Sequence, residues 1–182
     1  AGNSSPSFVP GKIGKSLSFQ GNDYVGYQNT ILSNTGPVTV QAWIKTNTSN
    51  QGGIVSRYGN SGAYNYRLYL NSSTGKVSFN RGNGTWDNTL TSTNALNNNQ
   101  WHFISGVHDA NTMYLYIDGR LDTSIGQTGT AGVVSNWWFM IGNDSYSPAV
   151  SYGHNFFNGL IDQVRIYNYA RSPAQIAYDY NK

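Results

Sequence analysis

The segment that decides the fold is FFNGLIDQVRIYNYARSPAQIAYDY, residues 156–180. Its first half predicts a β-strand, because the apolar residues Leu160, Val164 and Ile166 mark a strand-like run. Asp162 interrupts this run, although aspartate is depleted in strands and a buried carboxylate without a partner is costly. A specific partner must therefore hold the Asp162 carboxylate.

The second half of the segment predicts one short helix over residues 172–180. Ser172 is suited to the N-cap, and Pro173 to the first helical position. Ile176 and Tyr180 stand four residues apart and therefore share one helix face. We expect this face to pack against the strands.

Strand-like runs also recur at short intervals through the rest of the chain, and turn residues close each one. Residues 38–46 alternate most clearly, with Val38, Val40, Ala42 and Ile44 on one face. The other runs cover residues 16–19, 24–27, 53–58, 65–71, 76–80, 100–109, 112–119, 137–143 and 159–168. With no long amphipathic helix, this pattern predicts an all-β fold, a two-sheet antiparallel sandwich with one short C-terminal helix.

Composition agrees with an all-β fold and excludes some functions. Only 10% of the residues are charged, and all eight acidic residues are aspartate. Helical surfaces are normally rich in Glu, Lys and Arg, so this surface is not expected to be helical. The net charge is +3, but no cluster of Lys or Arg suggests nucleic-acid binding. No apolar run is long enough to predict a membrane span.

The length of 182 residues predicts one domain. We expect residues 1–10 to be a tail or linker remnant and residues 11–182 to be the domain. The opening AGNSSPSFVPG lacks the features of a signal peptide, which fits either an intracellular protein or a mature fragment of a longer one. Cysteine is absent, so disulfides cannot indicate the compartment.

The whole chain resembles the LamG-like jelly-roll domains of the concanavalin A-like lectin/glucanase superfamily. The pattern FxGxIDxVRIYNxAxS in the closing segment is the most specific feature. The resemblance implies a jelly-roll sandwich. It rests on residues 12–25, 38–47, 100–124 and 157–176.

The resemblance also implies a calcium site. In such domains the first and last strands lie side by side, which would bring residues 20–23 close to Asp162. Asn22, Asp23 and Asp162 would then offer the oxygen ligands that Ca²⁺ prefers. Gln20 stands where the family has an aspartate. The alternative is that Asp162 accepts hydrogen bonds from backbone N–H groups of the nearby loop, without a metal.

Catalysis is not expected, although the superfamily includes glycoside hydrolases. Glycoside hydrolysis usually needs two carboxylates, and the glucanases of the superfamily carry them in a Glu-x-Asp-x-Glu run. This chain has no glutamate, and its closest aspartates, Asp118 and Asp122, lie in a DGRLD turn. His102 and His108 share a strand face and are interpreted as ordinary strand residues. A lyase that uses Tyr and His on a sheet remains an alternative.

Aromatic and polar side chains oppose the apolar faces of several strands. In residues 65–71, Arg67 and Tyr69 alternate with Leu68 and Leu70. A sheet face with Tyr, Arg and Asn suits a carbohydrate, because sugar rings stack on aromatics and sugar hydroxyls bind amides and guanidinium groups. The alternative is packing beneath long loops, and we expect Trp43 to be buried.

Loops form a second candidate surface, since rigid sandwiches commonly carry binding residues there. The segments concerned are residues 56–65, 80–88 and 142–155. Together with Arg67 and Tyr69, the candidate ligand-binding residues are Arg57, Tyr64, Arg81, Trp86, Asp144, Tyr146 and His154.

These patterns predict a non-catalytic, lectin-like carbohydrate-binding module of a larger secreted or cell-surface protein. The expected partners are an oligo- or polysaccharide and the other domains of the parent protein, outside the cell or at its surface. One alternative is a structural or adhesion domain that binds proteins. A second is a polysaccharide hydrolase or lyase.

Overall fold

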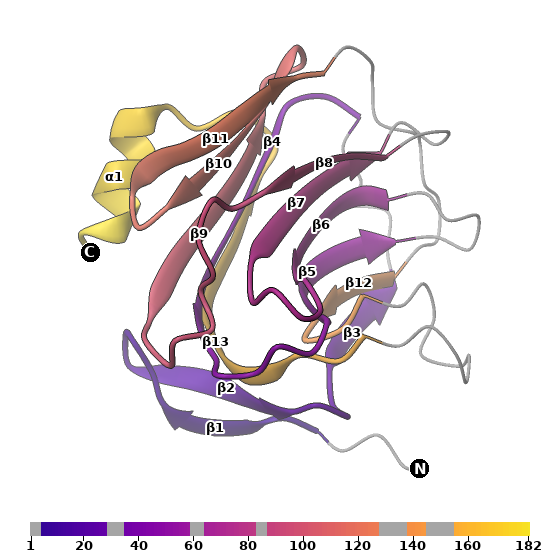
Figure 1. Cartoon of the computed structure of the whole chain (residues 1–182), viewed down its shortest axis with the longest axis vertical. Coiled ribbons are helices and arrows are strands. Elements are labelled where there is room, and N and C mark those ends of the chain that lie inside the picture. The colour runs from indigo at the N-terminus through magenta and orange to yellow at the C-terminus, as the bar shows by residue number, and fades with distance from the viewer. Residues whose placement is uncertain (1–4, 29–34, 59–63, 83–86, 128–137, 145–154) are drawn as a thin grey trace.

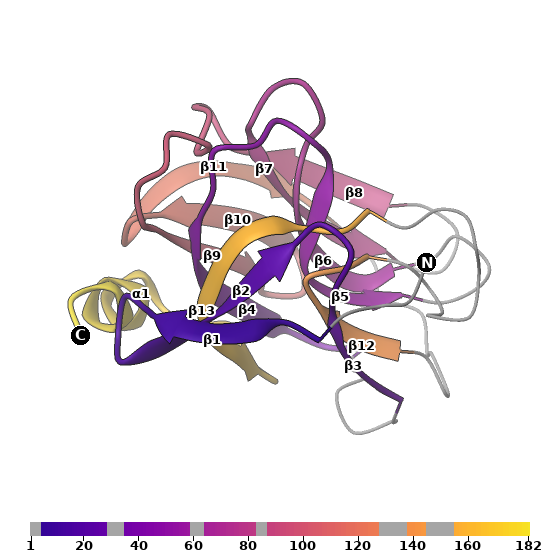
Figure 2. The same ribbon diagram turned by 90° about the horizontal axis from the view of Figure 1, so that it is seen from below.

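The computed structural model describes residues 5–28, 35–58, 64–82, 87–127, 138–144 and 155–182. Two antiparallel sheets pack face to face, and one short helix lies outside them (Figures 1 and 2). The predicted all-β sandwich is therefore confirmed. Within the described ranges, no helix has the length and apolar character needed to cross a membrane.

One sheet has seven strands and the other has six. The order in the seven-stranded sheet is β1 (Ser7–Pro10), β2 (Lys15–Gln20), β13 (Asn158–Tyr167), β4 (Val38–Lys45), β9 (His102–His108), β10 (Thr112–Ile117) and β11 (Arg120–Gly126). The order in the six-stranded sheet is β3 (Val25–Gln28), β12 (Trp138–Ile141), β5 (Gly52–Tyr58), β6 (Tyr64–Leu70), β7 (Val77–Gly82) and β8 (Asp87–Thr91).

The second strand, β2, lies beside the last strand, β13. The sequence predicts that residues 16–27 pair beside residues 159–168, and this is confirmed for residues 17–20. Gln20 of β2 pairs with Asn158 of β13, and Leu17 pairs with Ile161. The expectation was wrong for residues 24–27, because β3 crosses to the six-stranded sheet and pairs with β12.

The core fills the space between the two sheets. Val38, Val40, Ala42 and Ile44 of β4 are fully buried there, as their alternation predicted. Phe79 of β7 and other apolar side chains of the six-stranded sheet pack against them. Each fully buried Val, Ile or Phe side chain of this core contributes roughly 1.5–3 kcal/mol.

A β-bulge in β13 explains how an aspartate fits this strand. The register to β4 shifts between Asp162 and Arg165, and Gln163 has a φ of 49°. Asp162 Oδ1 accepts a hydrogen bond from the Gln163 N–H at 2.7 Å, and Oδ2 accepts one from the Ile13 N–H at 2.9 Å. The carboxylate therefore pairs with an N–H at the bulge and with the turn between β1 and β2.

Helix α1 (Pro173–Tyr180) covers the outer face of the seven-stranded sheet (Figure 1). Ser172 and Gln175 form a capping box at its N-terminus, which confirms the predicted N-cap. Ile176 is fully buried, and Tyr180 stacks on Trp43 with ring centroids 5.4 Å apart. Trp43 is only 2% exposed, so its predicted burial is confirmed.

Candidate functional site

The outer face of the six-stranded sheet carries two rows of polar side chains. In one row, Ser56, Arg67, Asn80 and Thr89 stand opposite one another across β5 to β8. In the other row, Tyr69, Ser78 and Thr91 do the same across β6 to β8. The strands alternate, so the apolar partners Leu68, Leu70, Val77 and Phe79 fill the core instead. These seven polar residues, with Asn71, are called the polar face below.

An ion pair fixes the centre of the polar face. The Arg67 guanidinium pairs with the carboxylate of Asp144 and lies 3.5 Å from the centroid of the Tyr69 ring. Burial raises the pKa of Asp144, while the charge of Arg67 acts in the opposite direction. Arg67 and Asp144 are 6% and 1% exposed, whereas Tyr69 is half-buried. The pair therefore holds one side of the Tyr69 ring and leaves part of this side chain open to a ligand.

Residues 143 and 144 can reach Arg67 because they cross directly over β5. The Ser56 hydroxyl donates to the Asn143 carbonyl at 2.9 Å. A Cβ atom on Gly53 would lie 2.4 Å from the carbonyl carbon of Asn143, so only glycine permits this close approach. Asp144 therefore reaches the polar face because Gly53 has no side chain.

Hydroxyl and amide groups extend the polar face across β7 and β8. The Asn71 amide donates to the Ser78 hydroxyl at 2.6 Å, and the hydroxyls of Ser78 and Thr91 lie 2.7 Å apart. The Asn80 amide donates to Thr89, and within the described residues its Oδ1 atom is buried without a partner. Ser78 and Asn80 are buried, whereas Thr89 and Thr91 are exposed. The buried pair therefore orients the two threonine hydroxyls, which a ligand can reach beside Tyr69.

Two of the described carboxylates, those of Asp144 and Asp118, are engaged by other groups of the chain. On the polar face, Asp144 carries the one carboxylate whose side chain is described. This carboxylate forms the ion pair with Arg67. Asp118 accepts hydrogen bonds from the Phe103 N–H at 2.8 Å and lies 2.9 Å from the His102 ring nitrogen. These contacts give both aspartates a structural role.

Two of the predicted ligand-binding residues lie on the wrong side of the sheet. Arg57 and Arg81 are 0% exposed and point between the sheets. Arg81 donates to the backbone carbonyls of Asn65 and Gly36, each at 2.6 Å. Burial lowers the pKa of both arginines, that of Arg81 to about 10. Arg81 shares the alternation of the core residues of β7, and this pattern was available in the sequence.

Some predicted residues remain predictions. Trp86, Tyr146 and His154 lie outside the described residues, and so does the side chain of Tyr64. Conversely, the prediction missed Thr89 and Thr91, because no strand was expected at residues 87–91. Ser78 and Asn80 did alternate with apolar residues in the sequence, which was the signal for their place on this face.

The geometry does not fit one calcium ion bound by Asn22, Asp23 and Asp162. Asp23 Oδ1 accepts a hydrogen bond from the Gln20 N–H at 2.7 Å, at the end of β2 where Asn158 pairs. Asp162 lies four residues further along β13, which is about 13 Å at the usual rise of a strand. Both of its oxygens already accept backbone N–H groups. No group of three or more His, Cys, Asp or Glu gathers within the described ranges.

A family model described as the concanavalin A-like lectin/glucanases superfamily matches residues 19–177. The chain belongs to this family. The resemblance seen in the sequence is thereby confirmed. A comparison with curated protein sequences found no match.

Two solved structures illustrate the fold. The chain is similar to domain 4 of AbnA, an extracellular GH43 arabinanase from Geobacillus stearothermophilus, in complex with arabinotriose. The TM-score is 0.78 at 20% identity, over 99% of this chain and 82% of that one. It is also similar to a native heptameric SAP-like pentraxin from Limulus polyphemus, with a TM-score of 0.69 at 17% identity, over 89% and 79% of the two chains. At these identities the likeness shows a shared fold alone.

Proposed function

We propose that this chain is a non-catalytic carbohydrate-binding module whose polar face contacts an oligo- or polysaccharide. The observation that carries the proposal is the half-buried Tyr69 ring, which Arg67 and Asp144 hold beside a surface of hydroxyl and amide groups. Sugar rings present C–H faces to aromatic side chains, and their hydroxyls pair with amides and hydroxyls.

Family membership and a similar structure support the proposal. The family unites lectins with glucanases, so sugar recognition belongs to its range. The similar arabinanase domain is in complex with arabinotriose, which shows that a domain of this fold accommodates an oligosaccharide. Fold alone does not define function, and the residues of the polar face are therefore the main support for this proposal.

We infer that the module binds its ligand without cleaving it. The chain contains no glutamate, and the Asp144 carboxylate is paired with Arg67. Glycoside hydrolases need one carboxyl group as acid and a second as nucleophile or base. The polar face offers hydrogen-bonding and stacking groups instead, which suits recognition.

We further propose that the module is part of a larger protein outside the cell or at its surface. Polysaccharides that such a module would meet lie there, and the similar arabinanase is described as extracellular. A carbohydrate-binding module contributes by keeping its neighbouring domains close to the polymer.

Affinity electrophoresis tests the proposed function. The folded protein is run through gels that contain arabinan, xylan, galactan, β-glucan or alginate, next to a gel without polysaccharide. We expect at least one polysaccharide to retard the wild-type chain and to retard the variant Tyr69→Ala less. Equal mobility of the wild-type chain in all gels would contradict the proposal, and release of new reducing ends would contradict its non-catalytic part.

A further inference from the structure

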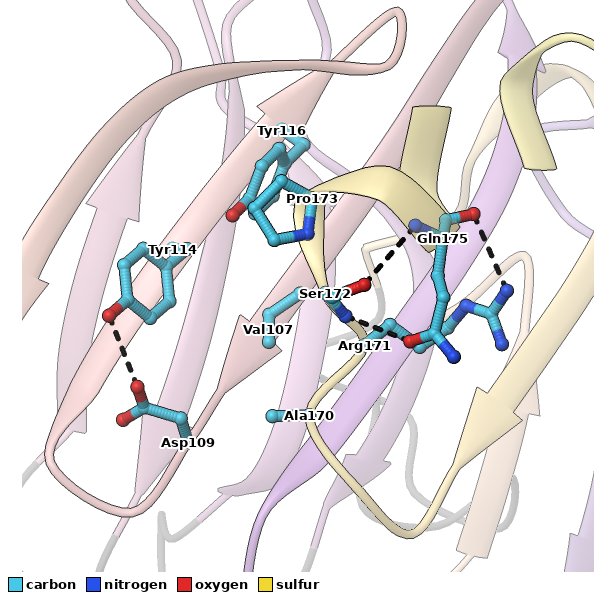
Figure 3. A pocket seen from close by; sticks show the side chains of 9 residues that line it. All are labelled: Val107, Asp109, Tyr114, Tyr116, Ala170, Arg171, Ser172, Pro173 and Gln175. Carbon is cyan, nitrogen blue, oxygen red and sulfur yellow. Dashed lines mark hydrogen bonds between the residues drawn. The ribbon is translucent and has the colours of Figure 1, made fainter. Parts of the chain in front are cut away.

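A separate pocket lies on the opposite side of the sandwich from the polar face. Its volume is about 340 Å³, and it lies open to solvent between strands β9 and β10 and the residues that lead into helix α1 (Figure 3). One wall carries Tyr114 and Tyr116, and Pro173 and Gln175 lie on the other. A volume of this order is at the small end for ligand pockets, so it suits one ring rather than a long polymer.

Tyr116 gives this pocket an unused polar group. The residue is only 5% exposed, and its hydroxyl lies on the pocket side (Figure 3). Among the described residues the hydroxyl has no hydrogen-bond partner, although a tyrosine hydroxyl usually finds one when the side chain is buried. Burial raises the pKa of Tyr116, so the hydroxyl stays protonated and can both donate and accept. Water or a ligand in the pocket must provide its partner.

Asp109 supplies an oriented acceptor beside the two tyrosines. Its Oδ1 atom accepts the backbone N–H groups of Asn111 and Thr112 at 3.0 and 2.8 Å. Its Oδ2 atom accepts the Tyr114 hydroxyl at 3.1 Å, which fixes the Tyr114 ring at the pocket wall (Figure 3). A carboxylate oxygen has two lone-pair sites, so Oδ2 retains one for a ligand hydroxyl.

Gln175 supplies the complementary donor. Its Oε1 atom accepts the Ser172 N–H at 2.9 Å in the capping box. Among the described residues, its side-chain NH₂ group has no hydrogen-bond partner, and the residue is exposed at the pocket rim. The pocket thus combines a donor, an acceptor and a hydroxyl with aromatic walls.

Charge disfavours an ionic ligand. Arg171 lines the pocket, but its guanidinium lies 2.8 Å from Asp179 and over the Tyr167 ring. The carboxylate of Asp109 would repel an anionic ligand, and the guanidinium of Arg171 would repel a cationic one. An uncharged ligand with hydroxyl groups avoids both conflicts.

We propose that this pocket is a second binding site, for a single neutral sugar residue whose ring packs against Tyr114 and whose hydroxyls pair with Tyr116, Asp109 and Gln175. The site goes beyond the polar face because it lies on the other sheet. A chain with two sugar sites on opposite faces can engage two glycan segments at once, which raises avidity without any new contact.

The test is an NMR titration of the folded chain with L-arabinose, D-galactose, D-glucose and D-mannose. We expect at least one of these sugars to shift the backbone amides of β9, β10 and residues 170–175 in a saturable manner. Tyr116→Phe removes only the unpartnered hydroxyl, so it should leave the melting temperature unchanged and weaken binding by about fivefold, the effect of one hydrogen bond. Tyr178→Phe, on the exposed side of α1, is the matched control and should bind like the wild type.

A second variant, Gln175→Glu, keeps the capping-box acceptor and removes the amide donor, so it should also weaken binding. The polar-face variant Tyr69→Ala should leave this site intact, which separates the two sites. The proposal is overturned if none of the four sugars shifts these amides, or if Tyr116→Phe and Gln175→Glu bind as the wild type does. A response to a lysine-containing peptide instead of the sugars would assign the pocket to a protein partner and also overturn it.

Discussion

The carboxylate of Asp162 accepts a hydrogen bond from the backbone N–H of Ile13, which is 149 residues away in the sequence. This contact ties the turn between β1 and β2 to the bulge in β13. Gly11 makes room for it, because a Cβ atom there would lie 2.6 Å from Asp162 Oδ2. The awkward aspartate of the closing strand is thus a structural link between the two ends of the chain.

Replacing this carboxylate should destabilise the fold. Asp162→Ala removes two charge-assisted hydrogen bonds and leaves the N–H groups of Ile13 and Gln163 without their acceptor. We expect the free energy of unfolding to fall by about 2–4 kcal/mol in urea denaturation. Asp122→Ala, which removes one surface contact to the Thr93 N–H, is the control and should cost less than about 1 kcal/mol. Equal losses for the two variants would contradict the role of Asp162.

The same geometry makes a prediction about calcium. Both Asp162 oxygens accept backbone N–H groups, and Asp23 lies at the other end of the strand pairing. Any change of Tm on adding calcium or EDTA should therefore be the same in the wild type and in Asp162→Asn. Calcium that raises the Tm of the wild type but not of Asp162→Asn would show that Asp162 binds the ion after all.

Gly53 should be essential for the ion pair between Arg67 and Asp144. In Gly53→Ala the new methyl group would meet residues 143 and 144 at 2.4 Å and push them away from β5. We expect a loss of about 1–3 kcal/mol in the free energy of unfolding, as for other overpacked sites. Gly126→Ala is the matched control, because a Cβ atom there meets nothing within 4 Å. Wild-type stability in Gly53→Ala would contradict the close approach.

His108 should make the fold sensitive to acid. It is 1% exposed, and within the described residues neither ring nitrogen has a hydrogen-bond partner. Burial, followed by the charge of Arg81, lowers its pKa from 6.5 to about 4. The unfolded chain therefore binds the proton more readily, so the contribution of His108 to stability is complete above pH 6.5, falls as the pH drops from 6.5 to about 4, and changes no further below that. The decline should reach at most about 3 kcal/mol.

Urea denaturation at several pH values measures this decline. His108→Leu removes the titrating group, so its stability should vary less across this range than that of the wild type. His102→Gln, on the same strand, should retain the decline. If the stability of His108→Leu declines with falling pH as much as that of the wild type, other groups cause the acid sensitivity.

The sequence was sufficient where the signal is local. Ser172 and Pro173 predicted the helix start because a capping box forms between near neighbours. Arg67 and Tyr69 were placed on the outer face because β6 alternates regularly. Arg81 was misplaced because the strand β7 extends two residues further than the Gly/Asn-rich sequence suggested.

Strand register separates two of the residues that the sequence assigned to one metal site, Asp23 and Asp162. The adjacency of β2 and β13 was correct, but their register sets Gln20 against Asn158 rather than against Asp162. The alternation in each strand excludes a shift of register by one residue, because such a shift would move every side chain to the other face. A shift by two residues keeps the same faces, so alternation alone does not determine which residues stand opposite each other. Asp23 and Asp162 were therefore expected to meet, although they lie apart.

Isothermal titration calorimetry on the polar face tests the central claim most directly. The ligand is the polysaccharide that retards the wild-type chain most strongly in affinity electrophoresis. Tyr69→Ala should weaken its binding by about 1–3 kcal/mol, the effect of an aromatic residue at the centre of an interface. Thr91→Val, also on this face, should weaken it less, and the control Tyr178→Ala should bind like the wild type. Circular dichroism confirms that each variant is folded.

The account predicts a dissociation constant in the millimolar to micromolar range for the wild type, and a loss of at least about fivefold in Tyr69→Ala. Folded Tyr69→Ala and Thr91→Val variants that bind the polysaccharide with the wild-type dissociation constant would contradict it, because the polar face would then not be the carbohydrate site.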